Sequence, residues 1–211
     1  MMRALAWILF TLMILLVTGC STPQPVDEAS QPIDISQDPI QVDYQTKTPI
    51  VIETDRGEFS LTPLARYRIA ARVVGKKRYR TGWESQISPM DLALAWGKLA
   101  AAEYDAYISY SQNNRWYFYQ YRAGSPFDKT FVITHSSNHH LIPATENLQQ
   151  ALDEIKEDDE IYLEGYLVNV SGTYRGRRVW WKTSLSRSDS GDGSCELFYV
   201  KRAQIDGQIF E

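Results

Sequence analysis

Residues 158–170 read DDEIYLEGYLVNV, and this stretch indicates the fold more clearly than any other part of the chain. Two acidic residues, Asp158 and Asp159, form a turn that leads into a run of β-branched and aromatic residues over 160–170. Gly165 interrupts this run, and a glycine inside a strand is typical of a bulge or of a corner in a small barrel. The stretch therefore predicts a strongly curved sheet that approaches a small barrel.

Short strands joined by tight turns are predicted on both sides of this stretch. The turns at 55–57 and 113–114 each lie between two apolar runs and predict hairpins. Polar and apolar side chains alternate over 65–72, as they do in a strand with one face in water. Strands and helices do not alternate along the chain, which argues against a doubly wound parallel sheet. Further strands are predicted at residues 131–134, 179–184 and 195–202.

Two helices are predicted. The segment 88–91 (SPMD) combines a capping residue, a proline suited to the first turn and an acid that completes a capping box. The largely apolar residues that follow predict a buried helix over 88–103. Thr145 caps the second helix, which extends over 145–156. The sequence as a whole predicts an α+β fold, with a mostly antiparallel, strongly curved sheet and these two helices.

Composition and charge exclude several classes of protein. The chain has 211 residues, of which 44% are hydrophobic and 12% aromatic, so a wholly disordered chain is excluded. The formal net charge of -4 argues against nucleic acid as a partner, because non-specific nucleic-acid binders are usually strongly basic. The sequence has no G-x-G-x-x-G, P-loop, C-x-x-C or H-E-x-x-H motif, so no cofactor is expected.

The start of the chain has the pattern of a lipoprotein leader. Arg3 precedes an uncharged apolar stretch that is shorter than a membrane span and suits a signal peptide. The end of this stretch, Val17-Thr18-Gly19-Cys20, resembles the lipobox of bacterial lipoproteins. The resemblance implies that residues 1–19 are removed and that Cys20 receives a diacylglyceryl group and a further acyl chain such as palmitate.

The same resemblance implies a location. Two or three acyl chains hold a soluble domain at a membrane surface almost permanently. The protein is therefore expected in a bacterial cell envelope, anchored to the membrane by its acyl chains. Ser21 follows the lipidated cysteine, where an aspartate would favour the inner membrane, so the outer membrane facing the periplasm is favoured. An uncleaved anchor or an ordinary secretory leader is the alternative.

Residues 20–49 are predicted to tether the domain to the membrane. Five prolines and five acidic residues fall between 21 and 49, against a single lysine. This composition is typical of a disordered linker. A short strand over 40–44 is the alternative for one part of it. The folded domain is then expected to cover 50–211 as a single unit.

Cys195 is the candidate nucleophile. Once Cys20 is acylated, Cys195 is the only free thiol, and a thiol needs a neighbouring base or cation to become nucleophilic. His139 or His140 would supply that base, with Asp189 or Asn138 orienting the imidazole. These residues would make a cysteine-dependent hydrolase or acyl transferase.

Two plainer interpretations of the same residues stay open. Cys195 fits an inert, buried position at the start of a strand, and the histidine segment 135–140 fits a polar loop. A metal site that combines these histidines with Asp189 or Asp192 is a weaker hypothesis, because their spacing suits no common ligand pattern. No metal is therefore expected.

Basic and aromatic residues provide a second candidate surface. Three arginines share one face of the strand predicted over 65–72, and two tryptophans lie within a second basic group. Such a surface suits an anionic lipid headgroup, an acidic glycan or another envelope protein. The candidate binding residues are Arg66, Arg68, Arg72, Asn138, Trp180, Trp181 and Arg187.

These observations favour a membrane-anchored envelope lipoprotein whose domain is a non-enzymatic binding or scaffolding module. The cysteine-dependent enzyme is the alternative, and the metal-binding loop is a weaker one.

Overall fold

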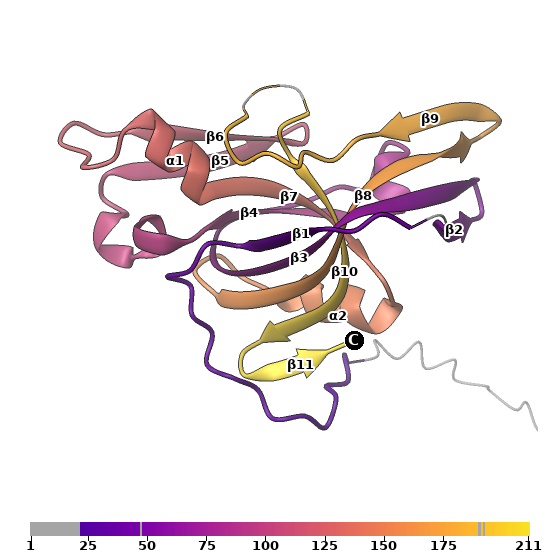
Figure 1. The fold of residues 1–211 in the computed structure, drawn as a ribbon, viewed down its shortest axis with the longest axis horizontal. Helices are drawn as coiled ribbons and strands as arrows, with labels where there is room; N and C mark the ends of the chain where they lie inside the picture. Colours follow the sequence, from indigo (N-terminus) through magenta and orange to yellow (C-terminus); the bar gives the residue numbers. More distant parts are fainter. Residues whose placement is uncertain (1–21, 47, 190, 192) are drawn as a thin grey trace, which may run out of the picture.

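The computed structural model describes residues 22–46, 48–189, 191 and 193–211. The expected leader, the acylated Cys20 and Ser21 lie outside these residues, as does Asp192. Figure 1 shows a strongly curved sheet with one helix near each of two ends.

The strands of the described chain are, in order, β1 (Ile40–Asp43), β2 (Ile50–Thr54), β3 (Gly57–Arg78), β4 (Met90–Ala95), β5 (Ile108–Asn113), β6 (Trp116–Tyr121), β7 (Ser136–Pro143), β8 (Glu160–Tyr174), β9 (Arg177–Trp181), β10 (Glu196–Ile205) and β11 (Gln208–Phe210). The helices are α1 (Lys129–His135) and α2 (Glu146–Glu154), with short 3-10 turns at Glu84–Gln86, Gly97–Ala100 and Ala102–Tyr104. β5 and β6 form a separate two-stranded sheet, and the other strands form one mixed sheet.

Five strands of the larger sheet are paired in a ring, from β3 to β4, β7, β10 and β8 and back to β3. β3 bonds β8 over residues 57–72 and β4 over 72–78, and within this ring only β7 and β10 are parallel. This order, with α2 between β7 and β8, is the connectivity of a Greek key of the OB type, which is partly open. The predicted α+β fold with a strongly curved, mostly antiparallel sheet is confirmed, and despite this ring of pairings the sheet stays partly open and is not a fully closed barrel.

Gly165 allows a close approach between two strands. It lies opposite Val200 of β10, and a Cβ at Gly165 would lie 2.0 Å from the Tyr199 carbonyl oxygen. The register of β8 and β10 shifts beside this pair, with Lys201 as the extra residue. The bulge that Gly165 predicts therefore forms in its partner strand, where it increases the local twist of the sheet.

The predicted helix over 88–103 is wrong. Residues Met90–Ala95 form β4, a strand between β3 and β7 in which all six residues are buried. A short apolar run has the same appearance in a buried helix and in a buried strand, because neither has a polar face. Leu92 and Leu94 pack into the core, and Asp91 is buried within the sheet instead of capping a helix.

The second predicted helix is confirmed as α2. Thr145 caps it, because its Oγ1 accepts a hydrogen bond from Leu148 N at 3.1 Å. Leu148 and Leu152 join the core inside the curved sheet, beside β10 and β11. The strand predicted at 131–134 is wrong, since α1 occupies these residues and the Asp128 side chain caps it by accepting from a backbone N–H of the first turn.

Residues 22–46 lie along the domain and do not form a free linker. β1 pairs with β3, as the alternative interpretation of 40–44 expects. Further upstream, Val26 N donates a hydrogen bond to Ile209 O at 2.8 Å. The prediction of a disordered tether over 20–49 is therefore wrong for these residues. Composition does not reveal that the edge of β3 and the end of β11 satisfy the backbone of this segment.

The β5–β6 hairpin lies beside α1 at one end of the molecule (Figure 1). Its turn residues, Asn114 and Arg115, have φ values of 51° and 69°, as a type I′ turn requires. The predicted hairpin is thus confirmed, with its turn one residue later, and so is the hairpin around 55–57, formed by β2 and β3. Ile108 of β5 and Val132 of α1 share an apolar cluster that holds the hairpin in place.

Candidate functional site

A pocket of about 110 Å³ opens between the β5–β6 hairpin, β7 and the loop that leads from β9 into β10. One side of it is aromatic and the other is polar. The residues that define these two sides are Trp96, Trp116, Tyr117, Tyr119, Asn138, Asp189, Cys195 and Glu196.

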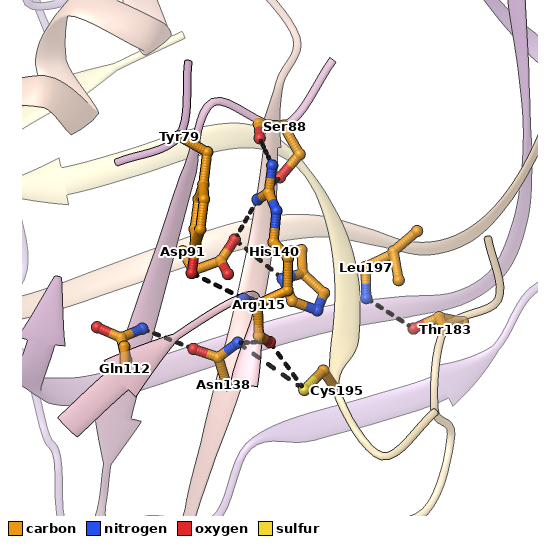
Figure 2. Close-up of polar contacts among 10 residues, drawn as sticks. All are labelled: Tyr79, Ser88, Asp91, Gln112, Arg115, Asn138, His140, Thr183, Cys195 and Leu197. Atoms are coloured by element: carbon orange, nitrogen blue, oxygen red, sulfur yellow. Dashed lines mark hydrogen bonds and ion pairs between the residues drawn. The ribbon is translucent and has the colours of Figure 1, made fainter. Parts of the chain in front are cut away.

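A buried ion pair fixes the tip of the hairpin beside this pocket (Figure 2). Arg115 Nη1 donates to Asp91 Oδ1 at 2.6 Å, and Nη2 donates to Ser88 O at 2.8 Å. His140 Nδ1 lies 2.9 Å from the same Asp91 oxygen. The Tyr79 ring covers the guanidinium, with its centroid 3.8 Å from Arg115 Cζ. Since a buried charge requires such partners, the hairpin is held in one position over β4 and β7.

Asn138 connects the polar side of the pocket to the hairpin. Its Oδ1 accepts from Gln112 Nε2 at 2.7 Å, and its Nδ2 donates to Arg115 O at 3.2 Å. The Asn138 side chain is therefore fixed by protein groups on both its oxygen and its nitrogen.

The Cys195 thiol has no imidazole as a partner. Its hydrogen-bonding contacts in the described chain are Asn138 Nδ2 at 3.8 Å and Arg115 O at 3.9 Å. Burial, followed by the nearby charge of Glu196, raises the pKa of Cys195 to about 12. Catalytic thiols have a lowered pKa, so this environment opposes nucleophilic chemistry.

The three histidines lie in different surroundings. His139 is in the core, with Nε2 3.2 Å from Tyr67 Oη, and burial lowers the pKa of His139 to about 3. His140 faces Asp91, because successive side chains of β7 point to opposite sides of the sheet. His135 ends α1. The structure places Asn138, Asp189 and Cys195 around one pocket but does not join either predicted base to the thiol.

Hydrogen bonds fix the described residues of the loop between β9 and β10. Ser184 N donates to Cys195 O at 3.0 Å, and Ser184 Oγ donates to Asp189 Oδ2 at 2.7 Å. Arg187 Nη2 donates to Pro39 O in the N-terminal segment. The loop therefore brings Asp189 and Arg187 to the pocket wall with both side chains already engaged.

Glu196 is the site residue that the sequence analysis misses. Glu196 lines the pocket and is 5% exposed as a whole residue, yet its buried Oε2 has no hydrogen-bond partner among the described residues. Burial raises the pKa of Glu196 to about 8, against the lowering effect of a hydrogen bond from Ser137. The sequence does contain a signal for Glu196. An acidic residue begins an otherwise apolar strand, and a charge buried at such a position needs a partner.

Arg115 and Asp91 are also absent from the predicted site. Asp91 fits the start of a helix equally well, which conceals its role as the buried partner of an arginine 24 residues later. An acid inside an apolar run would have been the signal for such a partner.

The three arginines predicted to share a binding face do not form one surface. Arg66 and Arg68 are exposed on β3. Arg72 is buried, and its Nη2 bonds Asp105 Oδ2 at 2.7 Å and Asp158 Oδ1 at 2.5 Å. Two carboxylates already neutralise Arg72, so it is not available to an anionic ligand.

The two tryptophans differ in the same way. Trp180 is 72% exposed on β9. Trp181 points to the opposite side of the strand, where its ring centroid lies 4.5 Å from that of His140 and 5.5 Å from Arg115 Cζ. Trp181 thus packs behind the buried ion pair, and only Trp180 offers a free surface.

In the described part of the chain, no three His, Cys, Asp or Glu side chains gather where they could hold a metal ion. No helix there has both the length and the apolar character needed to cross a bilayer. Comparison of the chain with protein-family models, with curated proteins and with solved structures gives no significant match.

Proposed function

We propose that the protein is an acylated lipoprotein of the bacterial envelope whose domain is a non-enzymatic binding module. The pocket between β6, β7 and the β9–β10 loop is its binding site. The observation that carries this proposal is Glu196, a lining residue of an aromatic-walled pocket whose buried Oε2 is satisfied by no described protein group. Buried polar atoms are rarely left in this state, and binding sites are where the exceptions occur.

The position of the pocket in the fold supports the same assignment. In OB-type connectivity, ligands bind over the second and third strands of the ring and the adjoining loops. Here those strands are β4 and β7. The pocket is lined by β7 and by the β9–β10 loop, which lies between β8 and β10, the last two ring strands in sequence order. This support is an analogy of fold alone.

A cysteine-dependent hydrolase is the second candidate, and the thiol environment disfavours it. Burial raises the pKa of Cys195 to about 12, and the contacts of its sulfur are an amide nitrogen and a backbone carbonyl oxygen. Only the presence of the thiol in the pocket wall favours chemistry there.

The proposed anchor at Cys20 would hold the domain close to the membrane. Because residues 22–46 lie along the sheet, little free chain separates the acylated residue from the domain. The pocket would then meet partners near the membrane surface, such as envelope proteins, glycans or lipid headgroups.

Site-specific photo-cross-linking in living cells tests the binding module. A photoreactive amino acid at Trp116, which is 38% exposed beside the pocket, should trap a discrete partner. The same group at Glu160, exposed on β8 and not part of the pocket lining, is the matched control. No adduct at Trp116, or equal adducts at both positions, would contradict the proposal.

A further inference from the structure

The pocket beside Glu196 combines an aromatic wall with an acidic group. The β6 side is built by Trp116, Tyr117 and Tyr119, and the other lining residues include the acids Asp189 and Glu196. Tyr117 is fixed in this wall, because its Oη lies 2.7 Å from Ser136 Oγ. The faces of aromatic rings attract cations, so both walls favour the same sign of charge.

The unpartnered Glu196 Oε2 indicates which chemical group a ligand must supply. This oxygen is buried and has no partner among the described residues, while the whole residue is 5% exposed. A carboxylate oxygen accepts hydrogen bonds or faces a positive charge. A ligand that binds the ionised form of Glu196 therefore carries a donor or a cation at this point.

The charges around Glu196 favour a cation. Among the described lining residues, Arg187 is the one cationic group, and it is already engaged with Pro39 O and lies 3.8 Å from Asp38 Oδ2. Asp189 adds a second negative charge to the wall. The titratable and charged groups around the Glu196 carboxyl are Tyr67, Tyr117, His139, Arg187, Asp189 and Cys195.

We propose that the pocket binds a ligand that presents a cationic ammonium group, seated between the Glu196 carboxylate and the rings of Trp116 and Tyr119. This assignment rests on the proposed function, since it names the ligand class of the same site. The size of the cavity, about 110 Å³, suits one small group at the end of a larger molecule. The ammonium group of a lipid headgroup, an amino sugar or a basic side chain has this chemistry.

Binding of such a cation is coupled to loss of a proton. Burial raises the pKa of Glu196 to about 8 in the free protein, so the carboxyl is mostly protonated at pH 7. The ammonium group favours the carboxylate, and the carboxyl proton passes to the buffer as the ligand binds. Affinity should therefore rise about tenfold per pH unit between pH 6 and 7 and level off above about pH 8.

A matched pair of small probes tests the ligand class. Choline carries a trimethylammonium group, and 3,3-dimethylbutan-1-ol has the same shape without the charge; N-acetylglucosamine serves as a neutral, hydroxyl-rich probe. The full-length protein in a polyoxyethylene detergent, which carries neither an ammonium group nor a sugar, is titrated with each probe by NMR and calorimetry. Choline should bind at least about tenfold more tightly than its neutral isostere and release close to one proton at pH 7.

Three variants locate the effect. Glu196→Gln keeps the size of the side chain and should abolish both the preference for choline and the proton release. Glu160→Gln makes the same change at an exposed position of β8 and should bind choline like the native protein. Trp116→Ala should weaken choline binding about threefold to tenfold while leaving proton release per bound ligand unchanged. Native-like NMR spectra of each variant establish that it is folded.

The outcomes separate this inference from the proposed function. Equal binding of choline and its isostere, a preference for N-acetylglucosamine, or an unchanged choline preference in Glu196→Gln would each overturn the ammonium assignment. If cross-linking from Trp116 persists in any of these cases, the binding module stands and only its ligand class is wrong. If cross-linking also fails, the proposed function fails with it.

Discussion

Arg115 Nη1 donates to Asp91 Oδ1 at 2.6 Å and so joins the turn of a surface hairpin to a fully buried position of a central strand. The hairpin forms one wall of the pocket, and β7, which neighbours β4, forms its floor. The ion pair therefore sets the distance between the two sides of the proposed site.

Breaking this pair should destabilise the protein strongly. Arg115→Met leaves the Asp91 carboxylate buried without its main partner, which costs about 3–5 kcal/mol for a buried pair. The double variant Asp91→Asn/Arg115→Met should be less destabilised than the sum of the single variants. Urea unfolding of the four proteins measures this coupling, and single losses below about 1 kcal/mol would show that the pair is unimportant.

The Cys195 thiol should be unreactive in the folded protein. With a pKa of about 12, its thiolate fraction at pH 8 is on the order of a thousandfold below that of a free cysteine. Alkylation by iodoacetamide should be slower by roughly that factor. The control is Ser188→Cys in a Cys195→Ser background, because Ser188 is exposed in the same loop. Equal rates for the two cysteines would revive the cysteine-dependent enzyme.

The stability that Glu196 contributes should fall as the pH rises from about 4.5 to 8, and above about 6.5, where the His139 contribution is constant, the net stability should fall with it. The pKa of Glu196 is about 8 in the folded protein, against 4.5 as the ordinary value, so the folded state keeps a proton that the unfolded state has lost. The free energy of unfolding then decreases with pH, by up to about 1.4 kcal/mol per unit. Glu196→Gln should remove this slope. Chemical denaturation of both proteins at several pH values checks it, and parallel curves would contradict the burial of Glu196.

His139 should act in the opposite direction at lower pH. Burial lowers the pKa of His139 to about 3 from 6.5, so between these values the unfolded state binds a proton that the folded state does not. Stability attributable to His139 therefore falls as the pH falls below about 6.5. Between about pH 4.5 and 6.5 the contribution of His139 offsets that of Glu196, so His139→Gln should leave a stability that falls as the pH rises through this range in the same denaturation series. An unchanged acid limb would show that the histidine is solvated.

Arg72 and Arg66 should differ in their effect on stability, although both lie on β3. Arg72→Met removes the charge-assisted hydrogen bonds from a buried guanidinium to Asp105 and Asp158, whose own side chains are 54% and 74% exposed, and should cost about 1–3 kcal/mol. Arg66 is exposed and contacts the Tyr44 ring, so Arg66→Met should cost less than about 1 kcal/mol. Thermal unfolding of the two variants compares them. Similar losses would mean that Arg72 is not part of a buried network.

The strands could be predicted where the sequence alternates or carries a specific turn. The hairpin predicted around 113–114 follows from local turn chemistry, with its turn one residue later, whereas the bulge that Gly165 predicts lies in the partner strand β10. The segment 88–103 could not be assigned, because a strand covered on both faces has no polar period to distinguish it from a helix. Its position between β3 and β7 depends on residues far away in the sequence.

The candidate site was only partly predictable for a similar reason. Asn138, Asp189 and Cys195 could be selected by residue type, and they do line one pocket. The role of Glu196 depends on burial, which the sequence does not display. The separation of His139 from Cys195 follows from the alternation of β7 once its register against β10 is known.

The carbon-13 NMR titration of the Glu196 side-chain carboxyl tests the central claim most directly. A midpoint near 8 in the free protein, shifting downward when choline is added, is the expected result. A midpoint at the ordinary value of 4.5, with no response to choline, would mean that the carboxyl is solvated or already paired. That result would remove the buried, unsatisfied oxygen on which both the pocket and its ligand class depend.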